Sequence, residues 1–345
     1  MAHLFVDSVA LSANVARLSA ALSAKGTRLI GVVKGNGYGL GLLNMAAALR
    51  PAAHMLAVDT LEEARALRQG GETLPLLVLA PLHTAEQVRQ LAELGAALLI
   101  GNPHLLEVCA AVGREWAPVA AHLMVDSGFG GYGFLPDALP PRHIEGIDWQ
   151  GIATHFSTAF AGERYTRAQF AKFSAARAAF DPDLFAHCCN SAATLRYPDM
   201  WCDAVRCGTL FAGRVGFGYT PVGQLRGSII ATHDLPKGAR LGYGSTYTLP
   251  RAATIGVVDV GYAHGLGMGK RRDALRLRDA IREARDALMR KPLQAKLPQG
   301  TARVVGRVNM HHTCLLVPGG TQVGTQVEFA VNPLMVPAEV PRVTD

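Results

Sequence analysis

Short apolar runs alternate with longer segments of helical periodicity over the first two-thirds of the chain. The runs are rich in Leu, Val, Ile and Ala, which is typical of strands buried on both faces of a parallel sheet. Eight such runs occur over about 215 residues, and this rhythm predicts a (β/α)8 barrel of the TIM type rather than an open sheet. They are Leu29–Val33, Met55–Val58, Leu76–Leu79, Ala97–Ile100, Val119–Val125, Gln150–Thr154, Leu184–His187 and Ala204–Arg206.

Capping residues mark the helix starts between these runs. Thr60–Glu63 and Thr84–Gln87 have the pattern of a capping box, in which the first and fourth residues bond to each other's backbone N–H. Asn102 followed by Pro103 supplies an N-cap and a proline at the first helical position. The segment Gly162–Phe180 has apolar residues at helical spacing, so we expect a long helix there.

The pattern changes after about Thr220, where Gly and Pro separate short alternating runs. Such runs predict a small, mostly antiparallel β domain. We therefore expect a barrel over residues 1–220 and a β domain over 221–345, with a basic helical insertion near 268–296. The expected strands of the second domain are Leu225–Thr232, Ala253–Val260, Thr301–Val308, Thr313–Val317 and Gln326–Ala330.

Composition excludes several classes of protein. The chain has 345 residues, 49% hydrophobic and 18% charged, which rules out intrinsic disorder. No apolar run approaches the roughly 18 residues of a membrane span, and residues 1–8 lack the features of a signal peptide. The six cysteines show neither a CxxC pair nor the spacing of a secreted framework. These features predict a cytoplasmic protein without a metal site.

The formal net charge is +7, and much of the excess lies between Lys270 and Lys296. Excess positive charge can attract nucleic acid, acidic membranes or anionic substrates. No aromatic residues are interleaved with these basic residues to stack on bases, and no nucleic-acid motif is present. The stretch is best interpreted as a solvated amphipathic helix, so we expect no nucleic-acid or membrane partner.

Polar residues occur where the predicted barrel strands end, which is where TIM-type barrels carry their chemistry. Lys34 is the most informative of them because it ends an apolar strand, where burial would make an amine nucleophilic towards a carbonyl. The others are Asp126, His155, His187, Asn190 and Arg206. Six such residues at one barrel face predict a site built around the lysine.

Two later loops supply features suited to a phosphate group. Asn190-Ser191 opens a short helix after the seventh strand, and Gly208-Thr209 follows the eighth. Barrels commonly bind phosphate at these two loops through backbone N–H groups. A lysine able to form a Schiff base beside a phosphate site implies pyridoxal 5′-phosphate (PLP) as cofactor.

The motifs around these residues resemble those of the alanine racemase family, in the same order and over nearly the whole chain. The resemblance implies a PLP-binding barrel of fold type III, a C-terminal β domain, and a head-to-tail homodimer whose active sites are built from both subunits. The motifs are VVKGNGYGLG (32–41), VDSGFGGYG (125–133), THF (154–156), HCCNSAATLRYPD (187–199), VRCG (205–208), YGSTYT (243–248), VGYAHG (260–265) and VGRVNM (305–310).

The resemblance also implies roles for individual residues. Lys34 matches the lysine that binds PLP covalently, and Tyr247 matches a second catalytic base donated by the partner subunit. Residues of the cofactor site are Tyr38, Ser191, Gly208 and Thr209 at the phosphate, Asn190 beside them, His155 by the ring and Arg206 facing the pyridine nitrogen. Met310 matches a contact of the substrate carboxylate, and we also expect Tyr262 and Arg307 in the substrate site.

The chemistry of racemisation explains these residue types. A proton must leave Cα on one face and return on the other, so Lys34 and Tyr247 are required on opposite sides. A tyrosine with an ordinary pKa near ~10 is a poor base at neutral pH, so positive charge must lie nearby. The guanidinium of Arg206 stays protonated and cannot give a proton to the ring nitrogen, which favours return of the proton to Cα.

Several positions depart from the family pattern. Gly131 stands where an arginine normally contacts the substrate carboxylate, and Met124 where many relatives carry a carbamylated lysine that supports it. His264 and His311 replace acidic residues, and Ala338 replaces a tyrosine that gates the substrate. These changes affect the substrate side and leave the cofactor side intact.

We therefore expect a homodimeric PLP-dependent amino-acid racemase, with alanine as the default small-molecule substrate. One alternative is a racemase for a larger amino acid, whose carboxylate Arg307 or the basic insertion would hold. A second is another PLP reaction on the same scaffold, such as a decarboxylation or a specialised biosynthetic step. A third is a non-enzymatic PLP-binding or nucleic-acid-associated protein.

Overall fold

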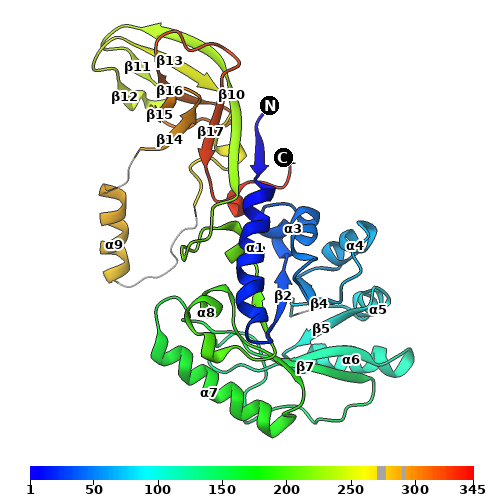
Figure 1. Cartoon of the computed structure of the whole chain (residues 1–345). Helices are drawn as coiled ribbons and strands as arrows, with labels where there is room; N and C mark the ends of the chain where they lie inside the picture. The colour runs from blue at the N-terminus through cyan, green and yellow to red at the C-terminus, as the bar shows by residue number, and fades with distance from the viewer. Residues whose placement is uncertain (82, 270–276, 290–291) are drawn as a thin grey trace. The chain divides into compact units, whose positions relative to one another are not determined.

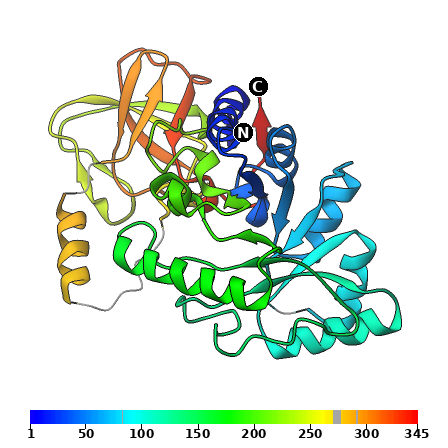
Figure 2. The ribbon, with the colours of Figure 1, turned by 60° about the horizontal axis from the view of Figure 1, so that its bottom comes forward.

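The computed structural model describes residues 1–81, 83–269, 277–289 and 292–345. Contacts between residues divide the chain into two compact units. One comprises Ser8–Val222, and the other combines Met1–Asp7 with Gly223–Asp345. Their elements are drawn in Figure 1 and, from a second direction, in Figure 2.

The first unit is a closed parallel barrel, as predicted. Its strands follow one another around the barrel in chain order, and the first pairs with the last, with Ile30 opposite Arg206. All eight predicted apolar runs form barrel strands, with end points that differ by a few residues. The strands are β2 (Arg28–Val32), β3 (Met55–Val58), β4 (Leu76–Val78), β5 (Ala96–Ile100), β6 (Val119–Met124), β7 (Ile147–Ala153), β8 (Phe185–His187) and β9 (Ala204–Cys207).

Apolar side chains from different strands fill the barrel interior. Ile30, Ala57, Leu77 and Leu99 belong to one buried cluster there, and each comes from a different strand. Because each strand contributes to the interior with one face and to the helix-covered exterior with the other, both faces must be apolar. This double burial explains why most of the strands are apolar runs in the sequence.

Helices connect the strands and lie outside the barrel (Figure 1). Helix α7 is the long helix predicted for residues 162–180, and it begins one residue later. The helices are α1 (Ser8–Ser23), α3 (Leu42–Leu49), α4 (Leu61–Gln69), α5 (Ala85–Glu93), α6 (Pro103–Glu115), α7 (Glu163–Phe180) and α8 (Ser191–Arg196), and the short turn Lys34–Tyr38 is α2.

The predicted caps are present, with one difference. Thr84 and Gln87 form the complete capping box at α5, and the side chain of Asn102 accepts from the backbone N–H of Leu105 at α6. At α4, Thr60 accepts from the N–H of Glu63, but Glu63 does not return a bond to Thr60. Its carboxylate bonds instead to backbone groups outside the helix, which sequence spacing does not reveal.

The second unit is built on an eight-stranded sheet with the order β13-β16-β15-β14-β17-β10-β1-β18. Every pair is antiparallel except β1 with β18, so the predicted mostly antiparallel domain is confirmed. The strands are β1 (His3–Val6), β10 (Gly223–Leu235), β13 (Ala253–Val258), β14 (Gln294–Leu297), β15 (Gly300–Val304), β16 (Thr313–Val317), β17 (Gln326–Ala330) and β18 (Arg342–Thr344), and a separate ribbon joins β11 (Arg240–Leu241) to β12 (Tyr247–Thr248).

Two expectations for this unit need correction. The strand predicted over Thr301–Val308 ends at Val304, because the following residues form a loop that crosses Gly306 at positive φ. The predicted insertion near 268–296 contains the helix α9 (Leu277–Leu288) but also the strand β14, which pairs with β15 and β17. Residues 270–276 and 290–291 of that insertion lie outside the described residues.

Among the residues that the structure describes, no helix combines the length and the apolar character needed to cross a membrane.

Candidate active site

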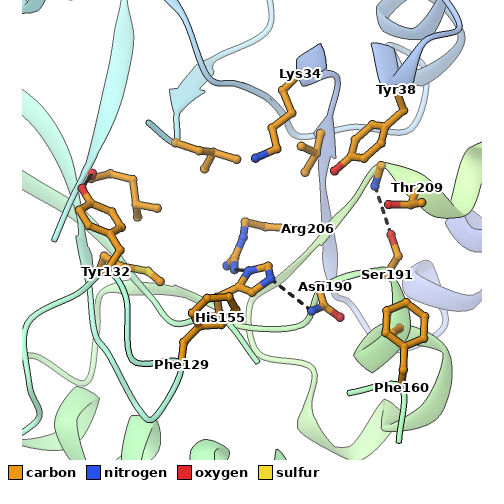
Figure 3. A pocket seen from close by; sticks show the side chains of 16 residues that line it. Lys34, Tyr38, Phe129, Tyr132, His155, Phe160, Asn190, Ser191, Arg206 and Thr209 are labelled. Carbon is orange, nitrogen blue, oxygen red and sulfur yellow. Dashed lines mark hydrogen bonds between the residues drawn. The ribbon is translucent and has the colours of Figure 1, made fainter. Parts of the chain in front are cut away.

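A cavity of about 450 Å³ lies at the ends of the barrel strands (Figure 3). Its volume is in the range of small-molecule sites. The lining includes every predicted cofactor residue, and all of them belong to the unit Ser8–Val222. These residues are Lys34, Tyr38, His155, Asn190, Ser191, Arg206, Gly208 and Thr209.

The backbone that carries Lys34 has an uncommon conformation. Residues Gly35 to Tyr38 all have positive φ values, including 53° at Asn36 and 54° at Tyr38. Residues other than glycine rarely adopt this left-handed backbone conformation. Backbone strain of this kind is concentrated at functional sites. The side chain of Asn36 stabilises the turn by accepting a hydrogen bond from the N–H of Leu42, at 2.9 Å.

Lys34 is not the desolvated amine that the sequence suggested. Its side chain is 37% exposed, and Nζ lies 3.0 Å from Oδ2 of Asp59 and 3.3 Å from Oδ1. The expectation of burial is wrong because Lys34 lies beyond the apolar strand, at the open end of the barrel. A carboxylate, rather than an apolar wall, is the immediate neighbour of the amine.

Hydroxyl and backbone groups gather on one side of the cavity. The hydroxyl of Ser191 accepts from the N–H of Gly208 at 3.3 Å, and Thr209 follows directly. A Cβ at position 208 would lie 2.1 Å from the Tyr38 ring and 2.6 Å from the Val32 carbonyl oxygen, so only glycine fits. Burial raises the pKa of Tyr38, although Lys34 and a bond to Thr209 oppose this. Its hydroxyl is therefore a neutral hydrogen-bond donor.

The guanidinium of Arg206 is buried and held by four acceptors. Nη1 donates to Nδ1 and to the carbonyl oxygen of His187, both at 2.7 Å. Nη2 donates to the Thr154 carbonyl oxygen at 2.6 Å and lies 3.3 Å from Nδ1 of His155. These contacts fix the cation at the floor of the cavity.

The histidines around Arg206 are neutral. Burial, with the positive charge of Arg206 as a second cause, lowers the pKa of His155 to about 3 and of His122 to about 4. The same two causes place the pKa of His187 far below its usual range. His155 also lies 3.4 Å from Nδ2 of Asn190, which donates to the Phe156 carbonyl oxygen.

The opposite side of the cavity is apolar. Tyr132 is fixed there because its hydroxyl donates to the Leu99 carbonyl oxygen at 2.6 Å. A Cβ on Gly131 would meet only the Phe129 ring, at 3.6 Å, so this position has room for a side chain. The apolar lining comprises Leu79, Leu99, Met124, Phe129, Tyr132 and Phe160.

The remaining predicted site residues belong to the other unit. Tyr247 begins β12, and the guanidinium carbon of Arg303 lies 5.7 Å from its ring centroid. The N–H of Tyr262 donates to the Asn309 carbonyl oxygen, and the Met310 side chain beside it is 52% exposed.

Arg307 is exposed in the same unit. The rings of His264 and His311, two of the departures from the family pattern, are 5.7 Å apart. The structure thus brings these two substitutions together, although they are distant in the sequence.

Three residues of the site escaped the sequence reasoning. Asp59 directly follows a barrel strand, so the rule that selected Lys34 applies to it as well. Glu63 looked like a helix cap, and its bonds to other loops depend on the tertiary structure. His122 lies inside β6, where a polar residue within an apolar run was the available signal.

Comparisons with known proteins agree with this geometry. Residues 6–214 match the model of the alanine racemase N-terminal domain, and residues 222–338 match that of the C-terminal domain. An alanine racemase of Desulforamulus reducens is 33% identical over 258 residues, which cover 69% of this chain and 70% of the relative.

A second relative, an alanine racemase of Geobacillus stearothermophilus, is 31% identical over 347 residues, covering 93% of this chain and 82% of the relative. The crystal structure of an alanine racemase from E. faecalis superposes with a TM-score of 0.84 at 26% identity, covering 100% of this chain and 98% of the other. The two matched domain models and these relatives span nearly the whole chain, and the chain therefore belongs to the alanine racemase family.

Proposed function

We propose that this chain is a PLP-dependent amino-acid racemase that interconverts L- and D-alanine and acts in the cytoplasm as a homodimer. The observation that carries the proposal is the cavity, whose lining brings the Lys34 amine, a group of hydroxyl and backbone N–H donors and the Arg206 cation around one space. The relatives that match most of the chain are named alanine racemases. The family models support residues 1–220 and 221–345 as the functional domains.

The residues present fit PLP. The hydroxyls of Tyr38, Ser191 and Thr209 and the N–H of Gly208 are donors suited to a phosphate. The close approach of Tyr38 to Gly208, which leaves no space for a Cβ, brings these donors together. Arg206 would face the ring nitrogen as a permanent donor, and His155 would lie beside the ring. Among the described residues that line the cavity, Lys34 is the only lysine.

Bound PLP withdraws electrons from the bond between Cα and its hydrogen, which makes that proton removable. Lys34 Nζ then takes or returns the proton on one face of Cα. Tyr247 does the same on the other face, and we propose that the partner subunit donates it. Arg206 cannot give a proton to the ring nitrogen at neutral pH, and this favours return of the proton to Cα.

We propose that the substrate carboxylate is bound by residues of the second unit. Met310 and Tyr262 are exposed on adjoining loops, and Arg307 supplies a positive charge. The guanidinium carbon of Arg303 lies 5.7 Å from the centroid of the Tyr247 ring, so a positive charge lies beside the proposed second base.

A racemase for a larger amino acid is the second candidate. The observation that favours it is the apolar side of the cavity together with the free space at Gly131. A side chain larger than a methyl group would contact this side. In this case the reaction is unchanged, and only the preferred substrate differs.

The decisive experiment combines a covalent trap with a substrate panel. The protein is saturated with PLP, reduced with borohydride and mapped by mass spectrometry, and we expect the label on Lys34. Exchange of the Cα proton for deuterium is then measured for all protein amino acids, with optical rotation as the measure of racemisation. An unlabelled Lys34 contradicts the proposed function, and racemisation of bulky amino acids but not alanine favours the second candidate.

A further inference from the structure

The proposed reaction assigns no role to Asp59. Its side chain nevertheless forms an ion pair with Lys34, the central residue of that reaction. Its two carboxylate oxygens lie 3.0 Å and 3.3 Å from Nζ of Lys34. Each side chain is 37% exposed, so the pair lies at the edge of the cavity and is neither fully buried nor fully solvated. The carboxylate is thus within direct reach of the amine.

The register of the barrel strands produces this pair. Strands β2 and β3 are parallel neighbours, with Val32 opposite Ala57. Two residues beyond this pair, just past the end of each strand, the chain reaches Lys34 and Asp59. Equal steps from a paired position bring both residues to the same edge of the barrel. The register of the two strands therefore places Lys34 and Asp59 near each other, at the edge where their side chains meet.

Glu63 connects the two loops that carry the pair. Its Oε1 accepts from the N–H of Gly35 at 2.7 Å, and its Oε2 accepts from the N–H of Asp59 at 2.9 Å. The helix cap at Thr60 holds Glu63 itself, through a bond of 3.1 Å from the Glu63 N–H. One carboxylate thus holds the residue after Lys34 and the backbone of Asp59 in fixed positions.

We propose that Asp59 is a positioning residue that holds the Lys34 ammonium at the edge of the cavity whenever this amine is not bound covalently. The inference rests on the proposed function, in which Lys34 must be released before it can act as a base. Neutral Lys34 accepts the Cα proton and becomes an ammonium ion, and Asp59 pairs with its charge. Tyr247 returns a proton to the opposite face of Cα, after which Lys34 loses its extra proton to solvent and Tyr247 regains one from solvent. Asp59 itself gains and loses no proton in this sequence.

The first test uses the protein without PLP and measures no catalysis. Trace acetylation with acetic anhydride, followed by peptide mass mapping, reports how readily Lys34 reacts, with the exposed Lys172 as an internal reference. Loss of a half-exposed ion pair should make Lys34 in Asp59→Asn react about twofold to fivefold faster. The matched control is Glu62→Gln, which removes an exposed carboxylate from the same helix start. Equal rates in the two variants overturn the proposal.

The second test uses the holoenzyme and separates the two faces of Cα. Deuterium at Cα slows the step in which a base removes the hydrogen from Cα. Lys34 removes it from one enantiomer of the substrate, and Tyr247 removes it from the other. In Asp59→Asn the isotope effect should therefore rise for one enantiomer only, and Asp59→Glu should restore most of the wild-type value. Equal changes for both enantiomers, or none, show that Asp59 does not act through Lys34.

The experiments distinguish a failure of the proposed function from a failure of the role proposed for Asp59. If the wild-type enzyme racemises no amino acid, the proposed function fails, while the acetylation rates still decide whether Asp59 controls the Lys34 amine. If the wild-type enzyme is active but Lys34 reacts equally in both variants, only the role of Asp59 is overturned. The unfolding temperature of each variant shows whether a change in rate reflects a change in folding.

Discussion

Nη1 of Arg206 lies 2.7 Å from Nδ1 of His187, inside the barrel. Arginine only donates hydrogen bonds, so Nδ1 of His187 is an acceptor and the ring proton is on Nε2. This Nε2 lies 2.7 Å from Nδ1 of His122, which must therefore accept. The direction of hydrogen bonding is fixed along all three residues, and both rings are neutral.

This arrangement predicts the effect of His187→Phe. The substitution removes one acceptor of a buried guanidinium, and an unsatisfied buried donor costs about 1–3 kcal/mol. We expect the free energy of unfolding in urea to fall by that amount and the affinity for PLP to weaken. His104→Phe, at an exposed position of α6, is the control. Equal stability of both variants would show that the bond to His187 contributes little.

The lowered histidine pKa values predict a loss of stability in acid. Between pH 6.5 and about 4, the unfolded chain binds protons at His122, His155 and His187 that the folded chain does not bind. The free energy of unfolding should thus fall as the pH is lowered, by about 1.4 kcal/mol per pH unit for each histidine, and level off near neutral pH.

Urea unfolding of the PLP-free protein at several pH values measures this dependence. The slope should be smaller in His122→Gln, since one of the three groups is removed, and unchanged in His104→Gln. A free energy of unfolding that is constant between pH 7 and pH 4.5 would contradict neutral histidines in the barrel.

Gly208→Ala tests the close approach of Tyr38 to Gly208, beside the proposed phosphate donors. The new methyl group would overlap the Tyr38 ring and the Val32 carbonyl oxygen. Overpacking typically costs about 1–3 kcal/mol, and the displaced Tyr38 should weaken PLP binding. Gly131→Ala is the matched control, because its methyl group meets only the Phe129 ring at ordinary contact distance. PLP titration followed by visible absorbance compares the two, and similar affinities would argue against a tight donor cluster.

Tyr247→Phe tests the proposed second base. Loss of a general base typically lowers the rate about 10²- to 10⁴-fold, so we expect racemisation to fall by at least 100-fold. The enantiomer whose Cα proton faces Lys34 should still exchange that proton for deuterium without inverting. Exchange and optical rotation measured together check this. Turnover that persists while exchange is lost would favour a different reaction on this scaffold.

Much of the fold was predictable because the signals are local. Most barrel strands are buried on both faces and therefore appear as apolar runs, and Thr84 and Asn102 cap their helices within four residues. The short strand β1 was not predicted, because its partners β10 and β18 lie more than 200 residues away. The strand β14 was missed for a similar reason, since the neighbouring basic residues favoured a helical interpretation.

The candidate site was likewise predictable only in part. The sequence by itself determined which polar residues follow the barrel strands, because strand ends are visible as the ends of apolar runs, and the resemblance of their motifs supplied the proposed roles. Only the tertiary structure decided that Asp59 pairs with Lys34, that Glu63 joins two loops and that His122 extends the contacts of Arg206. These contacts depend on the pairing register of neighbouring strands and on the convergence of side chains inside a closed barrel. The spacing of residues along the chain reveals neither the register nor which side chains meet.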